Sequence, residues 1–313
     1  MKTTCLINNF NYERFVFDAI ESALNQSISF DEIIIVDDCS TDNSLQMLKD
    51  KFLNHPQIKI IAKEINEGQL SSFNSGFLAS SGDLIFFLDS DDVYHAQYLK
   101  TAISIYREKK ECDFLFFQCY EFNDEASRYF EATQDMTISD VVKHTQDLGY
   151  SLASALCCRE YVGGPTSGLS MRRSIVEKIF PIPYLEDWRT RADDCLVFGA
   201  SIVKAKKFQA NLPLIGYRIH GNNSHYGNKS KLNSSVYYQR QVSLKRLFLF
   251  LCQRMNYPDN MFDLAPFEFK TIDKPTWRIL WVYIRIYLHD KGLLNGRIYG
   301  ILVMLKHMLR STP

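Results

Sequence analysis

The sequence has no surplus of charge, since its 313 residues include 36 Lys and Arg against 36 Asp and Glu. A protein that binds nucleic acid usually presents a positively charged surface, because it must neutralise phosphates. The composition therefore gives no support for a nucleic-acid partner. Any charge that serves a function must be concentrated locally.

The eight cysteines include no Cys-x-x-Cys pair and no spacing typical of a zinc site. The N-terminal residues also lack the apolar core of a secretory signal. We therefore expect reduced thiols and a cytoplasmic location. The adjacent Cys157 and Cys158 could form a redox pair, or they could be two small residues that fill apolar space.

Long apolar runs are missing as well. Charged residues interrupt every window of about 18 residues, the length that a membrane-spanning helix needs. The sequence therefore predicts no spanning helix. Peripheral attachment at the inner face of the plasma membrane stays open.

The first 110 residues alternate between apolar strands and helices. The strands are expected at "TTCLINNF", "DEIIIVDDCS", "IKIIA" and "DLIFFLDSDD", with helical periodicity between them. Runs that are apolar on both faces and alternate with helices are typical of a parallel sheet covered on both sides. The sequence therefore predicts an α/β fold with a mostly parallel central sheet flanked by helices.

The later chain continues less regularly. A helix is expected from Tyr94, followed by the strand "CDFLFFQCYEF". Residues 123 to 165 look polar and irregular, with one helix near "TISDVVKHTQDLG", which suits a loop region over a site. A strand and a helix then follow in "GLSMRRSIVEKIFPIP", and "ADDCLVFGASIVKA" is again helical.

Ser, Asn and Gly fill residues 221 to 235, and long amphipathic helices are expected after them. We place a domain boundary near residue 228. Residues 1–228 form the predicted catalytic domain, and residues 229–313 form a helical extension. Within the first domain, residues 1–110 are the nucleotide-binding half and residues 111–228 are the acceptor and base half.

Polar side chains stand where the apolar strands stop. These residues are Asn8, Asn9, Asp37, Asp38, Asp89, Asp91 and Asp92. In open α/β sheets, ligands bind beyond the carboxyl ends of the strands. We therefore expect these side chains to converge on one site.

Three carboxylates in "DSDD" repel one another, and a hard cation such as Mg²⁺ or Mn²⁺ would relieve that repulsion. In an extended segment, Asp89 and Asp91 point the same way and Ser90 points the opposite way. The alternative is that these residues only cap a helix that begins near Val93. The turn "NEGQLSSFNSG" adds a helix N-terminus suited to an anion, so a nucleotide fits this edge.

The chain resembles the inverting glycosyltransferase family 2 with the GT-A fold. The resemblance is carried by "INNFNYERFVFDAIESALNQS", "DEIIIVDDCSTDNS", "NEGQLSSFNSGFLASSGDLIFFLDSDD" and "YRIHGNN", and it covers residues 3 to about 225. It implies a nucleoside-diphosphate sugar donor, with a UDP-sugar favoured. The implied acceptor is a saccharide or a lipid-linked saccharide, in surface polysaccharide or glycolipid biosynthesis.

The resemblance also implies roles for single residues. The implied nucleotide contacts are Asn8, Asn9, Phe10, Asp37, Asp38, Asn66, Gln69, Asp89 and Ser90. Asp91, Asp89 and His220 would hold Mn²⁺ or Mg²⁺, and Arg218 would contact the diphosphate. The family often has Tyr-Asn where this chain has Phe10-Asn11, so a ring is kept there and a hydroxyl is lost.

The catalytic base is implied in "RADDCLVF". The family pattern favours Asp193, with Ala192 in place of a Glu, and leaves Asp194 as the alternative. Such a base would accept the proton of the acceptor hydroxyl. Alternatively, both aspartates would only cap a helix.

The C-terminal residues interleave aromatic and basic side chains in "KPTWRILWVYIRIYLHDKGLLNGRIYGILVMLKHMLR". Such helices could lie in a membrane interface. They could equally pack on the catalytic domain or form a homo-oligomer.

Two other functions remain open from the sequence. A metal-dependent nucleotidyltransferase would share the acidic site but normally has a glycine-rich loop near its N-terminus, which "INNFNYERF" lacks. A non-catalytic subunit that binds nucleotide sugars would tolerate loss of Asp91 or Asp193, and both are present.

Overall fold

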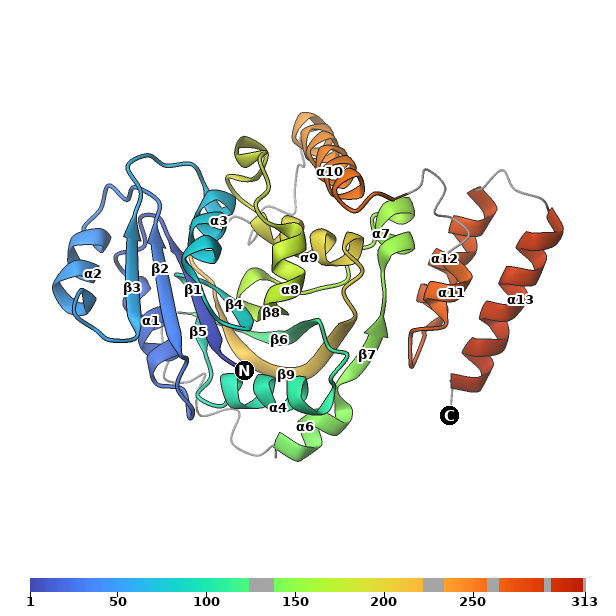
Figure 1. The fold of residues 1–313 in the computed structure, drawn as a ribbon, viewed down its shortest axis with the longest axis horizontal. Coiled ribbons are helices and arrows are strands. Elements are labelled where there is room, and N and C mark those ends of the chain that lie inside the picture. The colour runs from blue at the N-terminus through green and yellow to red at the C-terminus, as the bar shows by residue number, and fades with distance from the viewer. Residues whose placement is uncertain (124–137, 222–233, 258–264, 290–293, 312–313) are drawn as a thin grey trace.

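A nine-stranded sheet runs through the protein, with helices on both of its faces (Figure 1). The computed structural model describes residues 1–123, 138–221, 234–257, 265–289 and 294–311. The strands are β1 (Thr3–Asn9), β2 (Glu32–Asp37), β3 (Ile58–Ala62), β4 (Leu84–Asp89), β5 (Val93–Tyr94), β6 (Phe114–Phe122), β7 (Gln146–Gly149), β8 (Leu169–Arg172) and β9 (Lys207–Arg218). They lie in the order β3-β2-β1-β4-β8-β6-β9-β5, and β7 pairs with β9.

The helices connect and cover these strands. They are α1 (Val16–Leu24), α2 (Ser44–Phe52), α3 (Gln69–Ala79), α4 (Tyr98–Glu108), α6 (Ile138–His144), α7 (Leu152–Cys158), α8 (Arg173–Ile179), α9 (Ala192–Ile202), α10 (Ser234–Arg254), α11 (Ala265–Phe269), α12 (Trp277–His289) and α13 (Leu294–Ser311), with the 3₁₀ turns η1 (Thr166–Gly168) and η2 (Leu185–Trp188). The predicted α/β class is therefore confirmed.

The N-terminal half of the sheet is parallel. β1 pairs in parallel with β2 and β4, and its register sets Asn9 opposite Asp37 and Asn8 opposite Asp89. The carboxyl ends of these strands therefore meet at one edge. The other half is mixed, because β8 runs antiparallel to both β4 and β6 while β6 and β9 are parallel.

β4 is buried on both faces, which explains its continuous apolar run. Its residues alternate between two cores. Ile85 and Phe87 join the first core with α3, α8, α9 and α10, while Phe86 and Leu88 join the second with α1, α2, α4 and α6. Burial on both faces fixes the strand and therefore the carboxylates at its end.

The helix predicted from Tyr94 begins later. Val93 and Tyr94 form β5, which pairs with Gly216 and Ile215 of β9, and α4 starts at Tyr98. Pairing with β9 outweighed the helical pattern there. The region from 123 to 165, predicted to be irregular, contains the expected α6 but also β7 and α7, and residues 124–137 lie outside the described part.

The C-terminal helices divide between two environments. α10 adds Leu244, Leu247 and Leu251 to the first core, whereas α11, α12 and α13 build a core of their own against Ala153 of α7. The boundary predicted near residue 228 lies outside the described residues. Among the helices of the described part, none is both long and apolar enough to cross a bilayer.

Candidate active site

A cavity of about 510 Å³ opens at the carboxyl edge of the parallel strands. Its walls come from the ends of β1 and β4, the start of α3, η1 and the segment that leads into α9. The lining residues are Asn8, Asn9, Phe10, Asn11, Tyr12, Asp38, Asn66, Gly68, Gln69, Ser72, Asp89, Ser90, Asp91, Pro165, Thr166, Arg189, Thr190, Arg191, Asp193 and Tyr217. Of the seven strand-end residues predicted to converge, five line this cavity, whereas Asp37 and Asp92 do not.

The three acids of "DSDD" have ligand atoms within 4.8 Å of one another. Asp89 and Asp91 line the cavity, and Asp91 Oδ2 lies 2.9 Å from His220 Nε2. Asp92 is buried beneath them, where it accepts hydrogen bonds from Ser167 Oγ at 2.5 Å and from a backbone N–H at 3.0 Å. The helix-cap alternative is wrong for this segment, because β5 follows it and α4 begins only at Tyr98.

The electrostatics of this cluster favour a cation. Burial, with the nearby charge of Asp91, raises the pKa of Asp89 to about 7. Burial and the same charge also raise the pKa of the Tyr12 phenol, which hydrogen-bonds to Asp91. Carboxylate oxygens this close together fit a hard divalent cation, whereas His220 contacts Asp91 but neither belongs to the acidic cluster nor lines the cavity.

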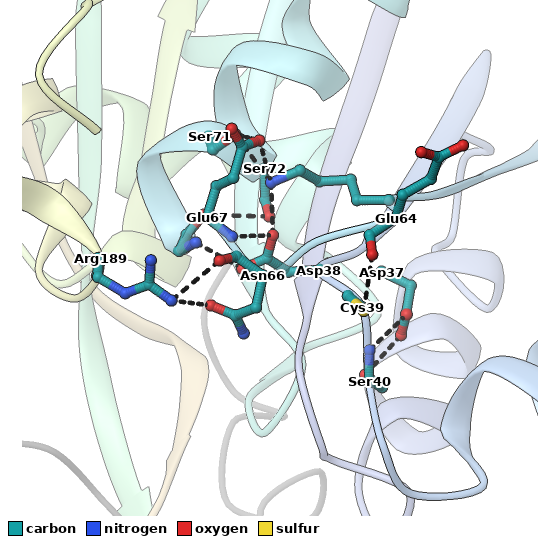
Figure 2. Close-up of polar contacts among 12 residues, drawn as sticks. Asp37, Asp38, Cys39, Ser40, Glu64, Asn66, Glu67, Ser71, Ser72 and Arg189 are labelled. Atoms are coloured by element: carbon teal, nitrogen blue, oxygen red, sulfur yellow. Dashed lines mark hydrogen bonds and ion pairs between the residues drawn. The ribbon is translucent and has the colours of Figure 1, made fainter. Parts of the chain in front are cut away.

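Asp37, which ends β2, and Asp38, which follows it, have different surroundings (Figure 2). Asp38 lines the cavity, but its carboxylate accepts hydrogen bonds from Lys63 Nζ at 2.5 Å and from Gly68 N at 2.6 Å. Asp37 is fully buried and accepts from Asn9 Nδ2 at 2.7 Å and from Ser40 N at 2.9 Å. We therefore correct the predicted nucleotide contact of Asp37, because its carboxylate binds the end of β1 and the turn after β2 instead.

The end of β1 presents one ring and two amides. Phe10 is 41% exposed and lines the cavity, so one ring face is available for stacking. Asn8 also lines the cavity, and with its amide nitrogen turned toward Asp89 it donates to Oδ1 of that residue at 2.9 Å. Asn9 is buried, and its amide serves mainly to hold Asp37. Ser90 is 1% exposed, so little of its surface remains for a ligand.

Arg218 does not lie where the resemblance placed it. Its side chain is 2% exposed, and its Nε donates to the Asp91 carbonyl at 2.8 Å while Nη2 pairs with Asp18 at 2.7 Å. The rings of Phe15 and Phe122 each lie 4.7 Å from its guanidinium carbon. The predicted diphosphate contact is therefore corrected, because Arg218 supports Asp91 from within the protein and is too deeply buried to reach a ligand.

Two other arginines, neither of which the sequence pattern assigns to the site, line the cavity. Arg189 donates through Nη2 to the Asn66 carbonyl at 3.1 Å and also to the Asn66 side chain (Figure 2). Arg191 has a left-handed backbone with φ of 65° and lies 3.4 Å from Asp194 Oδ2. The available signal was "RTRADD", with two arginines directly before the predicted base.

The two candidate bases differ in exposure. Asp193 lines the cavity, and its Oδ2 accepts a hydrogen bond from the Tyr161 hydroxyl at 3.0 Å. Asp194 is fully buried and accepts two hydrogen bonds from Arg240 of α10, at 2.9 and 2.8 Å. Asp194 is therefore corrected as a candidate base, because both of its oxygens are occupied away from the cavity.

Sequence comparison identifies relatives of this chain. A family model described as "Glycosyl transferase family 2" matches residues 4–180. The uncharacterized glycosyltransferase alr2836 of Nostoc sp. is 36% identical over 231 residues, which is 72% of this chain and 67% of that protein. TarS of Staphylococcus aureus, a poly(ribitol-phosphate) beta-N-acetylglucosaminyltransferase, is 30% identical over 111 residues, only 34% of this chain and 19% of TarS.

Solved structures show a similar fold at low identity. TarS residues 1–349 in complex with UDP-GlcNAc align with a TM-score of 0.56 at 16% identity, covering 99% of this chain and 90% of that one. The mannosyltransferase PcManGT from Pyrobaculum calidifontis, in complex with GDP-Man and Mn²⁺, aligns with a TM-score of 0.52 at 13% identity, covering 99% and 74%. The family match and these folds agree with the expectation from the sequence. The chain belongs to glycosyl transferase family 2 and has the GT-A fold.

Proposed function

We propose that this glycosyltransferase is a metal-dependent, inverting enzyme that uses a UDP-sugar. The acceptor would be a hydroxyl of a saccharide or a lipid-linked saccharide, in surface polysaccharide or glycolipid biosynthesis. One observation carries the proposal: a single cavity is lined both by the acidic pair Asp89 and Asp91 and by Asp193. Asp89 and Asp91 could bind the cation that accompanies a leaving diphosphate, and Asp193 could accept the proton of the acceptor hydroxyl.

The donor would lie along the strand ends. Phe10 offers a ring for the base, and Asn8 and Asp38 line the cavity close by. Arg189 and Arg191 are the cavity-lining cations that could neutralise a diphosphate. TarS was solved with UDP-GlcNAc and PcManGT with GDP-Man, so nucleobase choice differs among proteins of this fold.

Asp91, Asp89 and His220 would hold the cation, Mn²⁺ or Mg²⁺. When bound there, a divalent cation stabilises the negative charge that develops on the departing diphosphate. PcManGT, which shares the fold, was solved with Mn²⁺. Tyr12 and Arg218 keep Asp91 in place from two sides, through its carboxylate and its backbone carbonyl.

Asp193 would act as the general base. Its carboxylate accepts the acceptor hydroxyl proton while that oxygen forms a bond to the anomeric carbon. The bond from that carbon to the diphosphate oxygen breaks, and UDP leaves with the electron pair. Attack from the face opposite the leaving group inverts the anomeric configuration.

A nucleotide-sugar screen tests this function without knowledge of the acceptor. The purified protein with Mn²⁺ is expected to release UDP slowly from at least one UDP-sugar, because water can replace the acceptor. Chelation by EDTA should stop the release. No release from UDP-, GDP-, CDP- or dTDP-sugars, together with no melting shift on adding the four diphosphates with Mn²⁺, would rule out the proposed donor site.

We also propose that α12 contacts an anionic membrane surface. Trp277 and Trp281 are 58% and 61% exposed and lie one turn apart on the same helical face. Residues 277–313 contain six Lys and Arg but one acidic residue, in a chain with no net charge. Exposed tryptophans beside basic residues suit an interface rich in anionic headgroups.

Sedimentation with vesicles tests the membrane contact. The full chain is expected to pellet with vesicles that contain phosphatidylglycerol, and a Trp277→Ser/Trp281→Ser variant should pellet much less. Leu53→Ser/Leu78→Ser is the matched control, because these leucines are 64% and 72% exposed elsewhere. Equal pelleting of both variants would refute the proposal. If instead the protein is a dimer and only the Trp variant loses the dimer, the face of α12 that carries Trp277 and Trp281 contacts a second copy of the chain.

A further inference from the structure

Gln69 joins the two chemical halves of the cavity through one side-chain amide. We infer that Gln69 is a positioning residue for sugar transfer, which fixes the start of α9, and with it Asp193, relative to Asp89. This inference rests on the proposed function, since it assumes that Asp193 is the base and that Asp89 serves the donor side. Both polar ends of the Gln69 side chain bond to protein groups, so this role replaces the nucleotide contact implied by the family resemblance.

Both ends of the amide are engaged. Gln69 Nε2 donates to Asp89 Oδ1 at 2.8 Å, and Gln69 Oε1 accepts from Ala192 N at 2.9 Å. Asp89 ends β4, and Ala192 is the first residue of α9. Because the amide is planar and rigid, the two hydrogen bonds set the spacing between β4 and α9 at this point. A carboxylate could accept but not donate here, and an aliphatic side chain could do neither.

The backbone of Gln69 is itself held in place. Its N–H donates to the Arg189 carbonyl at 2.9 Å. Gly68, directly before it, has φ of 91°, and a Cβ there would lie 2.3 Å from the Arg189 Cα. Only glycine permits this approach, and Asp38 accepts from Gly68 N on the other side. The backbone of Gln69 is therefore fixed between the strand ends and the segment before α9, and this fixes where its side-chain amide begins.

The N-terminal turn of α9 depends on this bond. The first N–H groups of a helix have no partner within the helix. In the part of the chain that the structure describes, the N-cap residue of α9, Arg191, makes no side-chain capping bond. Gln69 Oε1 satisfies the Ala192 N–H from another element, one residue before Asp193. Loss of this bond would free the turn that carries the base.

The other contacts of this turn hold different groups. Tyr161 binds the carboxylate of Asp193, and Arg240 binds that of Asp194. Among these three residues, Gln69 alone also reaches the acidic pair at the end of β4. Its removal is therefore expected to disturb the relation between base and donor while both groups remain present.

Gln69→Met tests the inference, because it keeps the length of the side chain and removes both polar groups. We expect kcat for UDP release from the most active UDP-sugar of the screen to fall by about 10- to 100-fold, the cost of a small misplacement of reacting groups. KM for that UDP-sugar and the melting shift produced by UDP alone should stay near their wild-type values. Gln69→Asn, which is one methylene too short to span both bonds, should behave similarly.

Gln26→Met is the matched control. Gln26 is also buried, and its amide donates to the carbonyls of Ser22 and His95 and accepts from Leu99 N. It does not line the cavity. The control variant should lose stability while the folded protein keeps its kcat.

Several results would overturn the inference. One is a wild-type kcat in either folded Gln69 variant. Another is a loss of kcat matched by an equal loss of UDP binding, and a third is an equal loss in Gln26→Met. If Gln69→Met does not fold, the result with Gln69→Asn decides. Absence of turnover in the wild-type protein with every donor would overturn the proposed function, and this inference with it.

Discussion

Asp193→Asn is expected to lower kcat for sugar transfer by about 10²- to 10⁴-fold, the usual contribution of a general base. Asparagine keeps the size of the side chain and can still meet the Tyr161 hydroxyl, but its amide cannot take up the acceptor proton. The substitution changes no residue at the strand ends. Melting shifts with UDP and Mn²⁺ should therefore match those of the wild type, which separates loss of chemistry from loss of donor binding.

Asp194→Asn is the matched control for this prediction. Asp194 is fully buried, whereas the side chains of Arg240 and Arg191 are each 32% exposed, so its substitution breaks an ion pair whose cations water can still reach. We expect a loss of stability of roughly 1.5–3 kcal/mol, the usual contribution of a hydrogen bond to a charged group, measured as a lower melting temperature. Near-normal transfer by Asp193→Asn, with a well-folded but inactive Asp194→Asn, would instead move the base to Asp194.

Much of the fold could be predicted because the pattern that signals it is local. The run from Leu84 to Leu88 is apolar at every position, and burial of both faces of β4 requires that pattern. The two-residue strand β5 could not be predicted, since nothing in Val93 and Tyr94 indicates that β9 will pair with them. Long-range pairing decided that segment against its helical pattern.

The candidate site also has features that follow from the local sequence pattern and features that depend on long-range contacts. That acids and amides gather at the strand ends follows from the parallel sheet, and Asp38, Asp89 and Asp91 line the cavity as expected. Asp37 and Asp38 are neighbours of the same type in the sequence. Only the tertiary structure shows that Asn9 and Ser40 hold Asp37 away from the cavity, whereas Asp38, although bonded to Lys63 and Gly68, lines it. The sequence shows which acidic residues lie near the strand ends, but it does not show which hydrogen-bond donors of the protein contact them in the folded structure.

Arg218 and Arg240 illustrate the same limit for cations. The family resemblance assigns Arg218, the last residue of β9, to the diphosphate, yet the rings of Phe15 and Phe122 enclose it. Arg240 belongs to the predicted C-terminal extension, yet it binds the residue next to the proposed base. α10 therefore contributes directly to the surroundings of the site. No local pattern in residues 234–254 indicates this.

Asp91→Asn is expected to lower kcat by roughly 10³-fold, because a bound cation supplies several kcal/mol of charge stabilisation in the transition state. The variant keeps the shape of the side chain but loses the charge that faces His220 Nε2 at 2.9 Å. The added effect of Mn²⁺ on the melting shift with UDP should also disappear. Asp92→Asn is the matched control, because the buried Asp92 carboxylate accepts a hydrogen bond from Ser167. This substitution should lower stability while the melting response to Mn²⁺ remains.

The pH dependence of the Mn²⁺ effect on the melting shift with UDP is a second, independent test of the same site. Asp89 has a pKa raised to about 7, so near pH 6 it mostly holds a proton that a cation must displace. As pH rises through 7 the carboxylate ionises, and the cation binds without that cost. The Mn²⁺-dependent part of the melting shift with UDP should therefore be larger at pH 8 than at pH 6, while the shift with UDP alone changes less. An Mn²⁺ response that is equal at both pH values, or that survives in Asp91→Asn, would place the cation away from these carboxylates.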